Sequence, residues 1–205
     1  MIPEPGAFTI DTMVKAADSA AALTKPTPFP LGPSQILEST YEYWVKSYQA
    51  TDVKPPPPDY VTVSDTFSAS DLGEKNSANH TGTIALDKGY EAVHARIGES
   101  GSFWTDGHSV TVIVGNATSR TDTAGVRTVT LARQRGSIPW AVHTFRMSST
   151  TVTVEITASI TEDAFKEWQA DTHAKLTQAY RARLQEYEEK LATLELQAGI
   201  TIQGR

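Results

Sequence analysis

Histidine is the side chain best suited to bind a metal ion or to transfer a proton near neutral pH, so the histidines are the first candidates for chemistry. They are His80, His94, His108, His143 and His173. No two of them stand two residues apart on an expected strand or four apart on an expected helix, so no local spacing places two imidazoles on one face. His94 and His143 could meet across strands, but the alternation around His94 turns its side chain towards solvent. The spacing therefore predicts no metal site.

Three carboxylates form a second group. Asp65, Asp71 and Glu74 border a polar stretch, Ser68–His80, and carboxylate oxygens are ligands that calcium prefers. Their spacing matches neither an EF-hand loop nor a calcium-binding nonapeptide repeat. The favoured interpretation of this stretch is a solvated loop that crosses between two sheets, or a mobile lid.

The sequence lacks the short motifs of the common enzyme classes. It has no cysteine, which excludes disulfides, thiolate metal sites and cysteine nucleophiles. It has no glycine-rich phosphate loop, no nucleophile elbow and no His-Glu zinc signature. We therefore expect a protein without enzymatic activity or cofactor, unless catalytic residues converge from separate loops.

A sugar-binding face on a β-sheet would be marked by exposed aromatic side chains. Phe103 and Trp104 stand beside the Asp106-Gly107 turn, with His108 just after it, and these residues form a candidate ligand-contact loop. Trp140 stands at the start of an expected strand. Packing at the end of a hydrophobic core is the alternative for such aromatic residues, and it is the one that we favour.

Charge and hydropathy exclude several classes of partner. The formal net charge is −6, and no block of lysine or arginine forms the basic stripe that a nucleic-acid binder needs. No stretch approaches the roughly 18 apolar residues of a membrane helix. The N-terminus, MIPEPGAFT, has neither a positive segment nor an apolar run, so we see no signal peptide. These features predict a soluble protein that binds no nucleic acid and inserts into no membrane, and they do not identify its compartment.

Prolines divide the first part of the chain into short pieces. Apolar residues at helical spacing predict one helix over Thr9–Leu23 and a second that begins at Ser34. The second helix carries an aromatic stripe, Tyr41, Trp44 and Tyr48. It ends before four consecutive prolines, which hold the chain in an extended, semi-rigid strap. We expect the stripe to be covered by the sheet, the terminal helix or another subunit, and favour packing of both helices on the domain that follows.

The periodicity of apolar residues then changes to two, the pattern of β-strands with one buried face. The clearest strand is Thr151–Ile160, whose even-numbered residues would face the core. Turn signals such as Asp87-Lys88-Gly89 separate the strands. The expected strands are Tyr60–Phe67, Thr81–Leu86, Tyr90–Ile97, Ser109–Val114, Val126–Arg133, Ile138–Met147 and Thr151–Ile160. They predict a mainly β protein with α appendages, in which an antiparallel β-sandwich has about seven strands.

The stretch from Thr161 to Ala198 contains no glycine or proline and predicts one long helix, with Thr161 as its N-cap and Gly199 just after its end. About 37 residues at 1.5 Å each give a rod of roughly 55 Å, too long to lie on a sandwich over its whole length. Apolar residues in the distal half step by 4 and 3, and they are Tyr180, Leu184, Tyr187, Leu191, Leu194 and Ala198. This heptad seam either packs on the N-terminal helices or pairs with another chain.

Four stretches resemble an internal segment of very large, uncharacterised bacterial proteins. They are GYEAVHARI, RGSIPWAVHTF, AFKEWQADTHAKLTQAYRARLQEYEEKLA and GITIQGR, all within Ile84–Arg205. In those proteins similar sequence continues into further domains. The resemblance implies a sandwich with a long helix, as a module or as a homologous stand-alone subunit, and it implies no active site.

These patterns predict three parts: two short N-terminal helices and a proline-rich strap in residues 1–59, the sandwich in 60–160, and the long helix with a truncated strand in 161–205. We expect a non-enzymatic structural module in a larger bacterial or phage-like assembly. It would contact protein partners or self-associate through the C-terminal helix, with the aromatic stripe as a further contact. The alternative is a carbohydrate-binding sandwich of a secreted protein.

Overall fold

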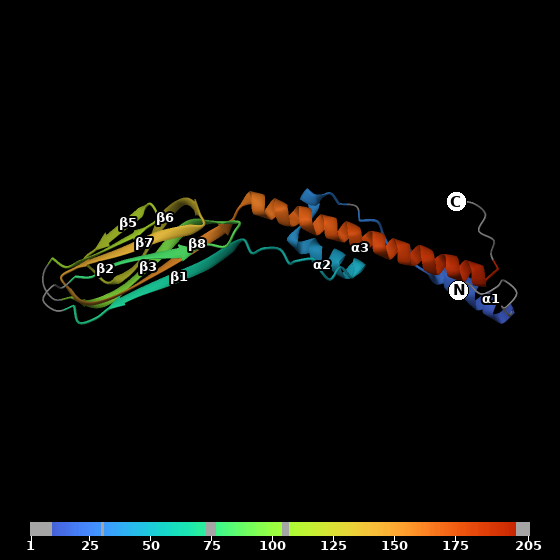
Figure 1. The fold of residues 1–205 in the computed structure, drawn as a ribbon, viewed down its shortest axis with the longest axis horizontal. Helices are drawn as coiled ribbons and strands as arrows, with labels where there is room; N and C mark the ends of the chain where they lie inside the picture. The colour runs from blue at the N-terminus through green and yellow to red at the C-terminus, as the bar shows by residue number, and fades with distance from the viewer. Residues whose placement is uncertain (1–9, 30, 73–76, 104–106, 200–205) are drawn as a thin grey trace. The chain divides into compact units, whose positions relative to one another are not determined.

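The computed structural model describes residues 10–29, 31–72, 77–103 and 107–199, and Figure 1 shows its helices and strands. The helices are α1 (Ile10–Ala22), a short 3₁₀ helix η1 (Pro33–Gln35), α2 (Glu38–Tyr48) and α3 (Glu162–Gln197). The chain divides into two compact units. The strand unit comprises Pro57–Glu167, and the helical unit comprises Met1–Pro56 together with Trp168–Arg205. The two parts that we expected to be separate, residues 1–59 and 161–205, thus lie mostly in one unit.

The strand unit is a sandwich of two antiparallel four-stranded sheets. The strand order is β1-β8-β3-β6 in one sheet and β2-β7-β4-β5 in the other. The strands are β1 (Tyr60–Ala69), β2 (Asn79–Ala85), β3 (Tyr90–Phe103), β4 (Ser109–Val114), β5 (Ala117–Thr121), β6 (Gly125–Arg135), β7 (Ser137–Phe145) and β8 (Met147–Ile160). The predicted mainly β, antiparallel architecture is confirmed. The connection between β1 and β2 joins strands of different sheets, as expected, but the predicted loop Ser68–His80 is too long, because its first two and last two residues belong to β1 and β2.

The sandwich has eight strands, so the predicted number of about seven is wrong. The missed strand is β5, whose sequence ATSRT is short and polar. A two-residue loop, Gly115 and Asn116, joins it to β4, and Val114 pairs with Ala117. Gly115 has a φ of +56°, the left-handed conformation that tight hairpin turns require. Because β5 is an edge strand of its sheet, few apolar residues mark it in the sequence.

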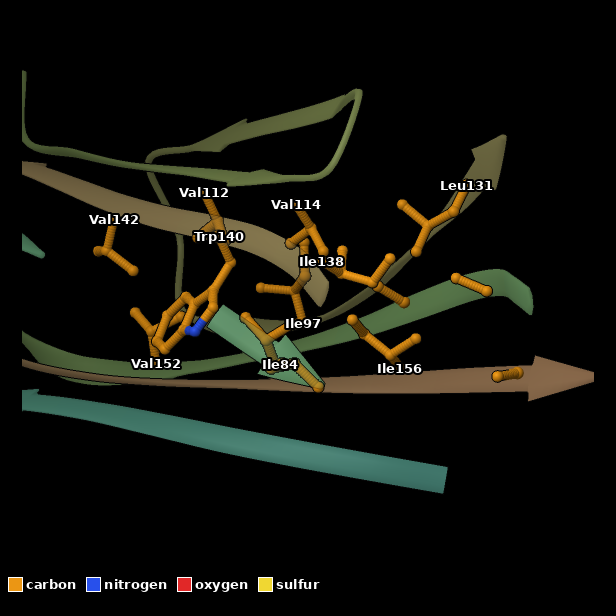
Figure 2. Close-up of a cluster of buried hydrophobic side chains, with 14 of the residues drawn as sticks. Ile84, Ile97, Val112, Val114, Leu131, Ile138, Trp140, Val142, Val152 and Ile156 are labelled. Atoms are coloured by element: carbon orange, nitrogen blue, oxygen red, sulfur yellow. The ribbon is translucent and has the colours of Figure 1, made fainter. Parts of the chain in front are cut away.

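The inward-facing residues of the two sheets form one hydrophobic core. In β8 the predicted alternation is confirmed, because Val152, Val154, Ile156 and Ala158 are all fully buried. Figure 2 shows the indole of Trp140 among the aliphatic side chains of this core. Trp140 is only 1% exposed, so its side chain packs in the core, as we favoured, and offers no surface to a sugar.

Strand β3 is longer than predicted, and its pairing with β8 shifts register at two points, between Ala92 and His94 and between Ser102 and Phe103. The expected strand stops before GESGSF, where apolar residues are scarce, whereas β3 includes this stretch. The neighbouring strand β8 supports it, with Ser100 paired with Thr151. A β-bulge between Ala92 and His94 shifts the alternation, so that Ala92 and Ala95 are both fully buried.

Helix α3 has the ends that the sequence predicts. The hydroxyl oxygen of Thr161 accepts a hydrogen bond from the backbone N–H of Ala164 at 3.2 Å, as an N-cap does. Gly199, with a φ of +69°, follows the helix in the left-handed conformation expected at this position. The 36 residues of α3 give a rod of about 54 Å. No helix in the described ranges is both long and apolar enough to span a membrane.

Candidate functional site

The helical unit is built around the first half of α3. Tyr48 of α2, Ala50 just after α2, and Leu176 of α3 are buried together, and Leu176 is 0% exposed. Segments that lie before and after the strand unit in the sequence thus share one hydrophobic cluster. The partly buried residues packed against it are Phe29, Trp44, Val45, Val53, Ala179 and Tyr180.

The aromatic stripe of α2 is part of this cluster. Trp44 and Tyr48 stack with their ring centroids 5.8 Å apart. Tyr48 also meets Tyr180 edge-to-face at 5.7 Å, and Tyr41 meets Trp168 in the same way at 6.1 Å. Such pairs contribute about 0.5–1.5 kcal/mol beyond the burial of area. The stripe therefore packs on α3, which differs from the favoured expectation of packing on the strand domain.

Polar side chains of α3 bind the backbone of the N-terminal segment. The buried amide of Gln169 donates a hydrogen bond to the carbonyl of Ile36 at 2.9 Å. The indole N–H of Trp168 donates to the carbonyl of Lys54 at 3.1 Å. Both carbonyls lie outside helices and strands, so these bonds satisfy acceptors that regular structure leaves open. They fix an irregular segment along the first half of α3.

The predicted heptad seam lies in the distal half of α3, and it is only partly covered. Its five large residues are all partly buried, and they are Tyr180, Leu184, Tyr187, Leu191 and Leu194. Tyr187 lines an open cavity of about 290 Å³ together with Leu23 and Pro26 of the N-terminal segment. Leu176, about one turn before the start of the seam at Tyr180, is fully buried by contrast. The seam therefore keeps apolar surface for a further contact.

Helix α1 contributes little cover to α3. Met13 lies against Gly199, just beyond the end of α3, and Ala16 is the buried residue of α1. Ile10 and Val14 are 81% and 53% exposed. Helix α1 thus supplies Ala16 and part of Met13 to the helical unit, while Ile10 and Val14 remain largely in solvent.

The candidate sugar-contact loop is only partly within the described residues. Trp104 and the side chain of Phe103 lie outside them, so their role stays a prediction. The Nε2 atom of His108 contacts the backbone carbonyl of Asp122, which ties His108 to the turn between β5 and β6. This contact gives His108 a structural role.

The remaining histidines do not gather into a site. His94 lies in β3 and His143 in β7, and these strands belong to different sheets. His143 Nδ1 is 2.8 Å from the side-chain oxygen of Asn79, and His173 Nε2 is 3.0 Å from the carbonyl of Leu31. Within the ranges that the structure describes, no group of three or more histidine, aspartate or glutamate side chains could hold a metal ion.

Asp65 and His80 close one open side of the sandwich, between the edge strands β1 and β2. Trp140 donates its indole N–H to Asp65 Oδ2 at 3.1 Å. The ring of His80 stacks on Phe67 at a centroid distance of 4.7 Å and meets Trp140 at 4.9 Å. Gly82 leaves room for the indole, because a Cβ at this position would collide with it. Asp65, a candidate calcium ligand in the sequence, thus binds a core tryptophan.

A buried ion pair lies at the other open side of the sandwich, where the edge strands β5 and β6 meet. Glu99 is 8% exposed and pairs with Arg127, whose Nε donates to Ser119 Oγ of β5 at 3.0 Å. Glu99 and Arg127 lie on neighbouring strands of one sheet, and the hydrogen bond from Arg127 to Ser119 is the contact that connects the two sheets. Burial raises the pKa of Glu99 above its ordinary value, although the hydrogen bond and charge of Arg127 lower it. Sequence reasoning missed Glu99, yet it alternates in phase with buried Ile97, and a longer predicted strand would have shown this.

We expect the ionisation of Glu99 to lower stability as the pH rises. Its pKa is higher in the folded than in the unfolded chain, so between these values the folded chain binds more protons, and the free energy of unfolding falls with rising pH. The window begins near the ordinary value of 4.5 and ends at the raised pKa. Urea unfolding over a pH series should show this fall in the wild type and lack it in Glu99→Gln.

The matched control is Glu155→Gln on the outer face of β8, which should keep the pH dependence of the wild type. An unchanged pH dependence in Glu99→Gln would contradict the assignment of the fall to Glu99.

Comparison with known proteins gives no family for this chain. No family model matches the sequence, and no curated protein matches it. The crystal structure of FlhE matches 48% of this chain and 98% of its own, with 9% identity and a TM-score of 0.31. A family two carbohydrate esterase from Cellvibrio japonicus matches 49% of this chain and 35% of its own, with 14% identity and a TM-score of 0.20. Likenesses at these TM-scores carry no functional argument.

Proposed function

We propose that this chain is a non-enzymatic structural module that makes protein–protein contacts in a larger assembly. The contact element is the helical unit, and the contact surface is the distal seam of α3. The observation that supports the proposal is the incomplete cover of this seam, where Leu184, Leu191 and Leu194 are only partly buried. The nearby helix α1 adds Ile10, which is 81% exposed.

Uncovered apolar surface provides the driving force for such a contact. Full burial of one leucine side chain contributes about 1.5–3 kcal/mol relative to full exposure, so each half-buried leucine retains part of this. Contiguous apolar surface on a folded protein is typical of interaction sites. The first half of α3 would bury little further apolar surface on a partner, because Leu176 and Gln169 are already buried against the N-terminal segment.

In this proposal the strand unit is a rigid support. Its two open sides are closed by internal contacts, the Asp65–Trp140 and Arg127–Ser119 hydrogen bonds, and Glu99 forms an ion pair with Arg127. Both carboxylates therefore have structural partners. The support and the contact element then lie in different units of the chain.

Charge in the seam is expected to disrupt the assembly. Leu184→Asp combined with Leu191→Asp places two carboxylates where a partner must bury apolar surface, and burial of an unpaired charge is strongly unfavourable. Size-exclusion chromatography of extracts from the cells that naturally produce the chain should show the wild type well above its 22.3 kDa mass and the double variant near it.

The control is Gln185→Asp combined with Ala192→Asp, which adds the same charge at the same spacing on an exposed face of α3. It should elute with the wild type. A wild type that elutes as a 22.3 kDa monomer, or a seam variant that elutes with the wild type, would refute the proposed function.

A further inference from the structure

The spacing of the seam assigns every residue of the distal half of α3 to a heptad position. In a heptad abcdefg, the apolar positions a and d alternate in steps of 3 and 4. Leu184, Leu191 and Ala198 then stand at a. Tyr180, Tyr187 and Leu194 stand at d. This assignment also fixes which charged residues flank the seam, at positions e and g.

The flanking charges are opposite on the two sides of the seam. Arg183 and Lys190 occupy g positions, with neutral Gln197 at the last g, and Glu188 and Glu195 occupy e positions after Arg181 at the first e. In a parallel pair of helices, each g residue faces the e residue five positions further along the partner helix. Arg183 would therefore face Glu188 of a second copy, and Lys190 would face its Glu195. Both contacts join opposite charges.

An antiparallel pair would lose this complementarity. In that arrangement g faces g and e faces e, so the basic residues Arg183 and Lys190 would face each other or neutral Gln197, and only Arg181 could still meet a carboxylate, that of Glu188 or Glu195. Like charges across a helix pair are destabilising and disfavour the wrong orientation. The charge pattern therefore selects a parallel partner with the same sequence.

Among the residues that the structure describes, no cation of the same chain pairs with the carboxylates that flank the seam. Arg183 and Lys190 both pair with Glu186 in their own helix, at 2.8 and 2.7 Å. Glu188 and Glu195 form no ion pair with any residue that the structure describes. Exposed ion pairs within a helix contribute little to stability, so the two cations can exchange partners at little cost.

The cover that the chain provides for its own seam is weak enough to be displaced. Tyr187 borders an open cavity, and the buried residue of α1 is only an alanine, Ala16. A second α3 would instead offer Leu184 and Leu191 to the same surface. The larger side chains would bury more apolar area, which favours the exchange of α1 for a partner helix.

We propose that the partner of the seam is a second copy of this chain, with the two α3 helices paired in parallel and in register over residues 180–198. The proposal rests on the proposed function, because it names the partner of the same surface. Arg183–Glu188 and Lys190–Glu195 contacts between copies set the orientation. Helix α1 moves aside from the seam in the pair.

Disulfide trapping tests the register. The chain contains no cysteine, so Leu184→Cys and Leu191→Cys each introduce a single thiol. A parallel pair in register places each a residue beside its own copy, and both variants should form covalent dimers on mild oxidation. An antiparallel pair can place at most one of these positions beside itself. Gln185→Cys and Ala192→Cys, on an exposed face of the same helix, should remain monomeric on a non-reducing gel.

Charge reversal tests the orientation independently. Glu188→Lys with Glu195→Lys leaves the ion pairs described within α3 intact and should weaken self-pairing about tenfold or more, since all four contacts between the copies become repulsive. Mixing this variant with Arg183→Glu, Lys190→Glu should restore pairing, because every contact between the two variants again joins opposite charges. Circular dichroism of each variant alone should confirm that α3 is still folded.

Two results would overturn the inference. One is the absence of covalent dimers from both Leu184→Cys and Leu191→Cys, and the other is equal pairing of the charge-reversed variant and the wild type. If the wild type is nevertheless large in extracts and the seam aspartates reduce its size, the proposed function stands and only the second-copy partner is wrong.

Discussion

Replacing Trp140 with alanine is expected to lower the free energy of unfolding of the strand unit by about 3–5 kcal/mol, the range for truncation of a large buried aromatic side chain. Trp140 is 1% exposed, and its indole N–H binds Asp65 Oδ2. The variant therefore loses core contacts, leaves a cavity and removes the donor that Asp65 binds. Urea unfolding followed by near-ultraviolet circular dichroism would measure the loss.

Two further variants separate packing from hydrogen bonding at this position. Trp140→Phe keeps an aromatic ring in the core but has no N–H, so its loss of stability should be smaller than that of Trp140→Ala. Asp65→Asn keeps a side-chain oxygen that can accept the bond, and it should cost least of the three. A Trp140→Ala variant as stable as the wild type would show that the indole contributes nothing to the core.

Replacing Leu176 with alanine is expected to destabilise the helical unit by about 2–5 kcal/mol, because Leu176 is 0% exposed at the centre of the cluster with Tyr48 and Ala50. Hydrogen exchange should quicken in α2 and in the first half of α3. Amides of the central strand β8 should keep their protection, since the two units have separate cores.

Leu184→Ala is the matched control on the same helix. Leu184 is only partly buried, so its truncation should cost clearly less than that of Leu176. If Leu176→Ala exposed β8 as much as α2, the two units would unfold together and would not be independent bodies.

Local signals in the sequence were sufficient to predict a strand or a helix wherever neighbouring residues alone mark its buried face or its ends. Strand β8 alternates from Thr151 onwards, and Val152, Val154, Ile156 and Ala158 are buried as predicted, while Ile160 at its end is partly buried. Helix α3 has a capping threonine, Thr161, and a glycine at its end, Gly199, and both take the predicted conformations. These features depend on neighbouring residues alone, which is why one sequence reveals them.

Features that depend on distant partners were missed. Strand β5 carries a polar sequence, and only its pairing with β4 makes it a strand. The bulge at Ala92 changes phase within β3 and has no local mark in the sequence. The packing of Tyr48 against Tyr180 joins residues far apart in the chain, so the aromatic stripe alone did not show which element would cover it. The seam was visible as a pattern, but its partial cover by the N-terminal segment required the structure.

Sedimentation equilibrium of the purified wild-type chain is the most direct test of the proposal that two copies pair through the seam of α3. Pairing through a short seam should give a dimer whose dissociation constant lies between about 1 μM and 1 mM, so this range of concentrations is the one to measure. The proposal predicts a mass that rises from 22.3 kDa towards twice this value, and a rise that disappears in Leu184→Asp, Leu191→Asp. A mass of 22.3 kDa at every concentration would contradict it.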